Sequence, residues 1–152
     1  MYKNYEGFSD PTAGLAMSHV MREYREERRR TWQRETEIKE RSKAYIASKY
    51  AGDTEKNKID AINYCRAAVK AGYIPVASHL LYPQILDDKN PHDRELGLLF
   101  GQALLACCDE VWFVGTKDKD GRIEMSDGMK AKYREARRLH KKVRFFAKEE
   151  IV

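Results

Sequence analysis

Short, mostly apolar runs that alternate with helical patterns are the feature that most constrains the fold of this chain. After Ser42 the runs cover residues 44–48, 74–77, 110–115 and 143–147. Segments with apolar residues at helical spacing lie between them. Such alternation is typical of repeated strand–helix units that build a parallel sheet. We therefore expect an α/β fold, a three-layer Rossmann-like sandwich in which a four-stranded parallel sheet of order 2-1-3-4 lies between helices.

Capping residues and helical spacing indicate where the helices of this unit lie. Asp53 or Thr54 is expected to cap a helix that ends near Gly72, and Ser126 is expected to cap the last long helix. The stretch from Pro91 to Cys108 is apolar nearly all round after Leu96, so it predicts a well-buried helix. The three cysteines are expected in the core: Cys65, Cys107 and Cys108.

The first 42 residues have a different pattern. Residues 1–14 show no period and are expected to form a loop or an arm, whereas Leu15 to Ser42 contain no Gly or Pro and carry opposite charges at four-residue spacing. This pattern predicts one long helix with a thin apolar stripe made of Met17, Met21, Tyr24, Trp32 and Ile38. Such a stripe buries little by itself, so the helix either lies along its own domain or, as we expect, pairs with another subunit in a homo-oligomer. The expected division is 1–42 and 43–152.

Composition excludes several classes of protein. A chain of 152 residues with 42% apolar residues can form one compact domain. The uncharged stretch from Leu96 to Cys108 is too short to cross a bilayer, and the polar start has no signal-peptide pattern. Three cysteines without CxxC spacing fit a reducing compartment. We expect a cytoplasmic protein that has no membrane partner.

The net charge of +5 is concentrated near the C-terminus. Residues 129–148 hold nine Lys and Arg against one acidic residue. Such a segment suits a nucleotide phosphate, a nucleic acid or an acidic partner, or it forms a solvated helix face. No metal-ligand spacing occurs, and neither GxGxxG nor GxxxxGK[ST] is present, so we expect no metal site and no cofactor.

Ligands of open parallel sheets bind beyond the carboxyl ends of the strands. This rule selects Ser48, Tyr50 and Gly52 after the first run, His79 and Tyr82 after the second, and Ser126 with Gly128 at the start of the last helix. Ser126 and Gly128 either help to bind an anion or belong to an ordinary helix cap. His79 is a general base, a stacking partner or a hydrogen-bonded structural residue, and either tyrosine could stack on a base or pack a loop.

Four separated motifs carry a resemblance to a known family: AYIASKYAGD, YCRAAVKAGYIPVASHLLYPQILDD, RELGLLFGQALLACCDEVWFVG and SDGMKAKYREARRLHKKVRFF. Over residues 44–147 the chain resembles the nucleoside 2-deoxyribosyltransferase-like superfamily, most closely its uncharacterised bacterial and phage branch. The resemblance implies a Rossmann-type sandwich that binds nucleosides or nucleotides. It also implies a Glu that attacks the anomeric carbon, and oligomers in which neighbouring subunits complete the pocket.

The sequence departs from the family pattern at the position of the nucleophile. The family's turn is Ser126-Asp127-Gly128 here, and the family's Glu position, four residues beyond Gly128, holds Lys132. A lysine ammonium cannot form the glycosyl ester that a carboxylate forms. Asp127 and Glu135 remain as candidate catalytic carboxylates, while the resemblance implies that Ser48, Tyr50 and Gly52 contact the sugar or the base.

Three functions follow as alternatives. The first is a transferase or hydrolase that acts on the N-glycosidic bond of a nucleoside or nucleotide. The second is a catalytically inactive nucleotide-binding protein, for example a phage protein that sequesters a nucleotide signal, in which Lys132 meets a phosphate. The third and least favoured is a nucleic-acid-binding protein, since no base-reading motif is present.

Overall fold

The computed structural model describes residues 10–151, so most of the expected arm, residues 1–9, lies outside the described residues. The chain divides between Glu40 and Arg41 into two compact units. Among the described residues, no helix combines the length and the hydropathy needed to cross a membrane.

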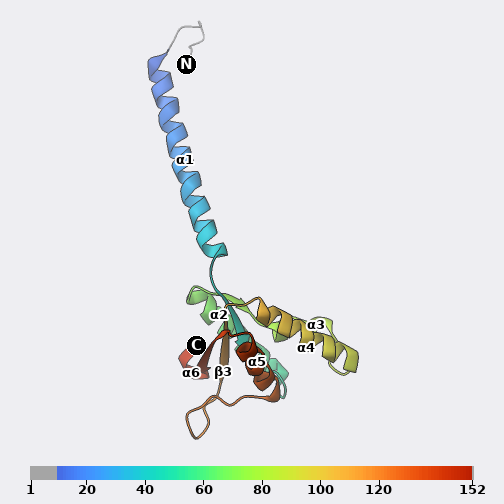
Figure 1. Cartoon of the computed structure of the whole chain (residues 1–152). Coiled ribbons are helices and arrows are strands. Elements are labelled where there is room, and N and C mark those ends of the chain that lie inside the picture. The colour runs from blue at the N-terminus through green and yellow to red at the C-terminus, as the bar shows by residue number, and fades with distance from the viewer. Residues whose placement is uncertain (1–9, 152) are drawn as a thin grey trace. The chain divides into compact units, whose positions relative to one another are not determined.

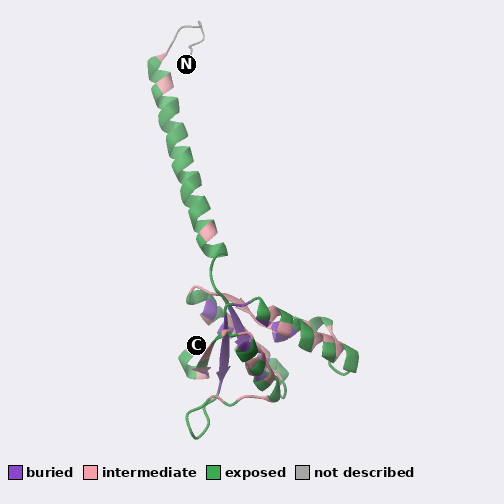
Figure 2. Ribbon diagram, viewed as in Figure 1, coloured by how far each residue is buried: buried purple, intermediate pink, exposed green. Residues whose placement is uncertain are grey.

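In the described part of the chain, the first unit is formed by the helix α1 (Pro11–Lys39). It begins four residues earlier than the sequence analysis predicts because Asp10 caps it, accepting hydrogen bonds from the backbone N–H groups of Thr12 and Ala13 at 3.0 Å. Pro11 stands at the first helical position, where a missing N–H costs nothing. No residue of α1 is buried, and Figure 2 shows the helix exposed along most of its length.

The second unit is built on a four-stranded sheet of β1 (Lys43–Ala47), β2 (Ile74–Val76), β3 (Glu110–Gly115) and β4 (Lys142–Ala147). The order is β2-β1-β3-β4 and every pairing is parallel (Figure 1). The sheet that the sequence predicts is therefore confirmed in strand number, direction and order. Its switch point lies between β1 and β3, so the polar residues after these strands meet at one edge.

Helices cover both faces of this sheet. On one face, α4 (Pro91–Ala106) and α5 (Asp127–Arg138) pack through Leu105, Met129 and Ala136 against Tyr45 and Phe113. The other face is covered by α2 (Thr54–Lys70) and the short α6 (Lys148–Ile151). On this face, residues of β1 and β3 that alternate with those of the first face are buried against α2: Ala44, Ile46, Trp112 and Val114. The two faces confirm the three-layer architecture.

Local sequence explains how α2 is bounded. The carboxylate of Asp53 accepts a hydrogen bond from the backbone N–H of Lys56, which makes Asp53 the N-cap. At the other end Gly72 has a φ of +88°, a left-handed conformation that favours glycine just beyond a helix. Both boundaries agree with the sequence analysis. The segment between β2 and α4, in contrast, holds the short helices η1 (Ser78–Leu80) and α3 (Tyr82–Ile85), which the sequence patterns did not predict.

The expectation that α4 is well buried is wrong. Only Gly101 and Leu105 of this helix are buried, whereas Leu98, Leu99 and Phe100 are 54%, 50% and 40% exposed. The helix contacts the sheet along one narrow stripe, so apolar residues on its other sides remain at the surface. Cys107, expected in the core, is also exposed because it follows the last turn of α4.

Candidate functional site

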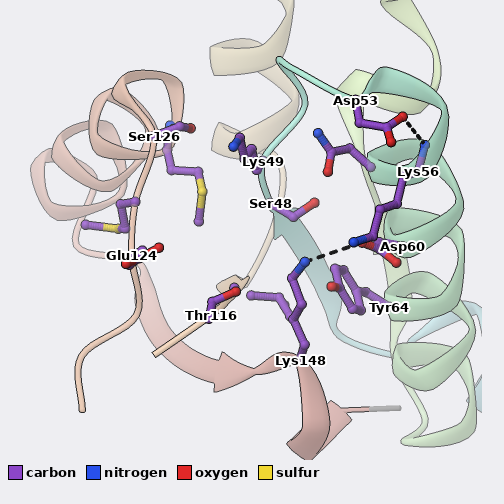
Figure 3. A pocket seen from close by; sticks show the side chains of 15 residues that line it. Ser48, Lys49, Asp53, Lys56, Asp60, Tyr64, Thr116, Glu124, Ser126 and Lys148 are labelled. Atoms are coloured by element: carbon purple, nitrogen blue, oxygen red, sulfur yellow. Dashed lines mark hydrogen bonds and ion pairs between the residues drawn. The ribbon is translucent and has the colours of Figure 1, made fainter. Parts of the chain in front are cut away.

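Two cavities lie at the carboxyl ends of the strands. The first, which we call the lysine cavity, has a volume of about 280 Å³ and is enclosed by α3, α4, η1 and α5. The second, which we call the tyrosine cavity, has a volume of about 490 Å³ and lies between the ends of β1 and β3, α2 and the start of α5 (Figure 3).

The lysine cavity brings together half of the residues that the sequence analysis selects. Its lining includes Tyr50, His79, Tyr82, Gly128 and Lys132. Ser48 and Ser126 line the tyrosine cavity instead. Gly52, Asp127 and Glu135 line neither cavity.

Lys132 is the central cation of the lysine cavity. It stands on α5, and its Nζ lies 5.6 Å from the centroid of the Tyr45 ring, within the range of a cation–π contact. Among residues 10–151, no carboxylate forms an ion pair with this ammonium group. Burial lowers the pKa of Lys132 to about 8 because the charged form is partly removed from water. The amine is thus still mostly charged at neutral pH, and it has no counter-ion in the described part of the chain.

His79 lies beside Lys132 and is 7% exposed. Its Nε2 is 3.3 Å from the Oγ of Ser48, while its Nδ1 is buried and has no hydrogen-bond partner among the described residues. Burial, and then the charge of Lys132, lower the pKa of His79 to about 4. The imidazole is therefore neutral at physiological pH, with one nitrogen left for a ligand atom or a water molecule.

The hydroxyl of Ser78 completes the polar floor of this cavity. It shares a hydrogen bond with the phenol of Tyr45, which is fully buried behind it. Burial raises the pKa of Tyr45 to about 12, so this phenol stays protonated. The hydroxyl of Ser78 fits under α4 because Gly101 has no side chain: a Cβ there would lie 3.3 Å from the Ser78 Oγ.

No carboxylate competes for Lys132 in the lysine cavity. The two acidic side chains in the lining, Asp88 and Asp93, are engaged at its rim: Asp88 faces Arg94 at 3.9 Å, and Asp93 accepts a hydrogen bond from the backbone N–H of Asp87. The floor therefore offers an ammonium group, an imidazole and the hydroxyl of Ser78, a set that suits an anionic or carbonyl-bearing ligand.

Apolar and aromatic side chains form the walls of the lysine cavity. The ring of Tyr82 packs on Phe100 with centroids 5.4 Å apart, and Leu86 and Leu98 extend this surface. Tyr50 enters from the loop after β1, whose carbonyl groups at Tyr50 and Ala51 are held by the side-chain amide of Asn57. A flat apolar group can pack against such walls.

The two candidate catalytic carboxylates lie away from this floor. The carboxylate of Glu135 binds the guanidinium of Arg138, which holds the pKa of Glu135 below its usual range. Asp127 is exposed in the first turn of α5. Ser126 acts as the N-cap of α5, since its Oγ accepts a hydrogen bond from the backbone N–H of Met129 at 3.3 Å. The cap is confirmed, while the catalytic roles remain predictions.

The tyrosine cavity was not anticipated. Its distinctive groups are an ion pair between Lys148 and Asp60, at 3.4 Å, and the side chain of Tyr64. Sequence patterns select neither Tyr64 nor Asp60, which lie one helical turn apart on α2. In the described part of the chain, no group of three or more His, Cys, Asp or Glu is placed to hold a metal ion.

Comparison with known proteins identifies the family. A model for a domain of unknown function, DUF7768, matches residues 42–146. The chain belongs to the DUF7768 family. None of the curated protein sequences matches it.

Comparison with solved structures adds a likeness in fold. The 2-deoxyribosyltransferase of the psychrotolerant bacterium Bacillus psychrosaccharolyticus is similar, with a TM-score of 0.56 over 70% of this chain and 72% of that chain. Its sequence is 12% identical, so the likeness concerns the fold. This DUF7768 domain therefore has a nucleoside deoxyribosyltransferase-like α/β fold.

Proposed function

We propose that the lysine cavity binds a phosphorylated nucleoside without cleaving its N-glycosidic bond. The observation that carries this proposal is Lys132, a cation without a counter-ion beside the buried, unpartnered Nδ1 of His79. A phosphate group would accept hydrogen bonds from both side chains, and its charge would offset the cost of keeping the ammonium group half-buried. The base would pack on the aromatic and aliphatic walls near Tyr82.

Among the described residues, no carboxylate lies on the floor of the lysine cavity, which supports binding of the nucleotide over cleavage. Departure of a base leaves positive charge at the anomeric carbon, which a carboxylate stabilises and an ammonium group opposes. The position that holds Glu in the resembled family holds Lys132, and Glu135 is occupied by Arg138.

Nucleic-acid binding receives less support from the basic segment. Several of its cations are engaged inside the domain: Arg144 with Glu110 at 3.1 Å, Arg138 with Glu135, Lys148 with Asp60, and Lys141 with the carbonyl of Ala106. A segment whose charges are used in this way presents a smaller positive surface than its composition indicates.

Calorimetry with a panel of nucleosides and their monophosphates tests the proposal. We expect the monophosphates to bind more tightly than the nucleosides. Lys132→Met should weaken the monophosphate roughly 10- to 150-fold, which corresponds to the loss of about 1.5–3 kcal/mol for a hydrogen bond to a charged group. The matched control is Lys130→Met, which removes an exposed lysine of the same helix and should change the affinity less than twofold.

Chromatography of the incubated samples tests the competing function. Negligible release of free base by the unmodified protein is expected. If the unmodified protein releases free base readily and Glu135→Gln or Asp127→Asn abolishes that release, the protein is a hydrolase and the proposal is wrong. Equal affinity for nucleosides and monophosphates would contradict the proposed contact between Lys132 and the phosphate.

A further inference from the structure

The tyrosine cavity is separated from the lysine cavity by the pair of Ser48 and His79. Ser48 lines the tyrosine cavity, while His79, its hydrogen-bond partner, lines the lysine cavity. The tyrosine cavity lies at the switch point between β1 and β3, on the side of the sheet that α2 covers. This is the place in an open α/β sheet where a ligand is expected.

Tyr64 gives this cavity an unused polar group. The residue is 2% exposed, and Figure 3 shows its hydroxyl end directed into the cavity beside Lys148. This hydroxyl faces the cavity and forms no hydrogen bond with a side chain in the range 10–151. Burial, then the charges of Asp60 and Glu149, raise the pKa of Tyr64 to about 12, so the hydroxyl remains protonated and can donate. The Tyr64 hydroxyl lines the cavity without a side-chain partner among the described residues, so it is available to a ligand atom.

The charges that line the tyrosine cavity are balanced, in contrast to the lysine cavity. Three lysines (Lys49, Lys56 and Lys148) face three carboxylates (Asp53, Asp60 and Glu124). One pair, Lys148 with Asp60, is in contact, which leaves the second oxygen of Asp60 as an acceptor. Hydroxyl groups of Ser48, Thr116 and Ser126 add further donors and acceptors.

We propose that the tyrosine cavity binds an uncharged, polyhydroxylated molecule of the size of a monosaccharide, independently of a nucleotide in the lysine cavity. A balanced lining gives no net attraction for an anion, whereas vicinal hydroxyls can donate to Asp60 and Glu124. The hydroxyl of Tyr64 then donates to a ring or hydroxyl oxygen of the ligand. Such a molecule satisfies both the carboxylates and the phenol, which an anion cannot do.

Saturation-transfer NMR and calorimetry on the full chain test this site with D-ribose, D-glucose and myo-inositol as probes. We expect at least one of them to bind with a dissociation constant in the millimolar range. Tyr64→Phe removes only the hydroxyl and should weaken that binding about fivefold, the effect of one neutral hydrogen bond. Asp60→Asn, a second variant, should weaken it by at least as much. The matched control is Tyr73→Phe, on a half-buried tyrosine that packs against Trp112 outside the cavity lining.

Several outcomes would overturn the second site. One is failure of all three probes to bind at tens of millimolar. Another is binding that is unchanged in both Tyr64→Phe and Asp60→Asn. A third is loss of probe binding in Lys132→Met, which would place the probe in the lysine cavity. The nucleotide experiment depends on Lys132 variants and this one depends on Tyr64 variants. The nucleotide site and the second site can therefore fail independently of each other.

Discussion

The Nε2 atom of His79 lies 3.3 Å from the Oγ of Ser48, and this contact connects two neighbouring parallel strands. Ser48 directly follows β1, and His79 lies in η1, just beyond β2. The contact fixes one nitrogen of the imidazole and leaves the other, Nδ1, buried beside Lys132. The neutral state of His79 is therefore a property of the fold that can be measured.

We predict that His79 makes stability depend on pH. Its pKa is about 4 in the folded protein against an ordinary value of 6.5, so between these values the unfolded chain binds a proton that the folded chain does not. The free energy of unfolding should thus be fully retained above pH 6.5 and should fall as the pH drops toward 4, by up to about 3 kcal/mol from this residue.

Urea unfolding at pH 7 and pH 4.5 checks this prediction. His79→Gln keeps a nitrogen near Ser48 but does not titrate, so its stability should fall less between the two values. The exposed His92, changed to Gln, serves as the control. Parallel pH profiles for the wild type and His79→Gln would contradict the prediction.

Lys132→Met should stabilise the protein while it weakens ligand binding. The pKa of Lys132 is about 8, which is below 10.5 because burial disfavours the charged form. At pH 7 the folded state bears that cost, so an apolar side chain of similar length should raise the free energy of unfolding by about 1–3 kcal/mol. Between pH 8 and 10.5 the wild type should gain stability, since only the unfolded chain then retains the proton, whereas the variant should not. Urea unfolding at pH 7 and 10 measures both effects, and a less stable variant at pH 7 would contradict the assignment.

The strands and helix ends could be predicted from sequence because local patterns mark them, and the strand order followed from the general rule for doubly wound sheets. The residues of β3 are apolar over nearly their whole length and are buried on both sides, which is the pattern of an internal parallel strand. Asp53, Gly72 and Ser126 mark helix ends through backbone hydrogen bonds that involve nearby residues only. These signals do not depend on distant parts of the chain.

The site was predicted less well because burial and pairing are tertiary properties. The rule that ligands bind at the strand ends selected Tyr50 and His79, and the family resemblance selected Lys132; all three line one cavity. The sequence could not show that Ser48 faces the other cavity or that the guanidinium of Arg138 binds the carboxylate of Glu135. The same reason explains the error at α4, since an all-round apolar helix has the same sequence whether or not its outer side is covered.

Self-association through α1 remains a prediction. The stripe of Met17, Met21, Tyr24, Trp32 and Ile38 is exposed, each residue by 40% or more. Met21→Glu should lower the mass measured by light scattering, because a charge would be buried between helices. Gln33→Glu, on the opposite side of α1, should leave the mass unchanged. Since α1 has no buried residue, neither change should alter the free energy of unfolding of the second unit by more than about 0.5 kcal/mol. If Met21→Glu leaves the mass of the assembly unchanged, α1 does not form the contact between subunits.

The last prediction compares two glycines of α4. Alanine in place of a helical glycine adds about 0.5–1 kcal/mol of stability through backbone entropy. Gly97→Ala should show this gain, because its Cβ would meet only the Cδ1 of Leu86 at an ordinary 3.5 Å. Gly101→Ala places a Cβ 3.3 Å from the Ser78 Oγ, and Ser78 is held by its hydrogen bond to Tyr45, so the hydroxyl pair must shift. We expect Gly101→Ala to be less stable than Gly97→Ala by about 1 kcal/mol or more in urea unfolding, through strain in a packed region. Equal stability of the two variants would mean that the Ser78 hydroxyl moves freely, and the floor of the lysine cavity would then be less rigid than its contacts indicate.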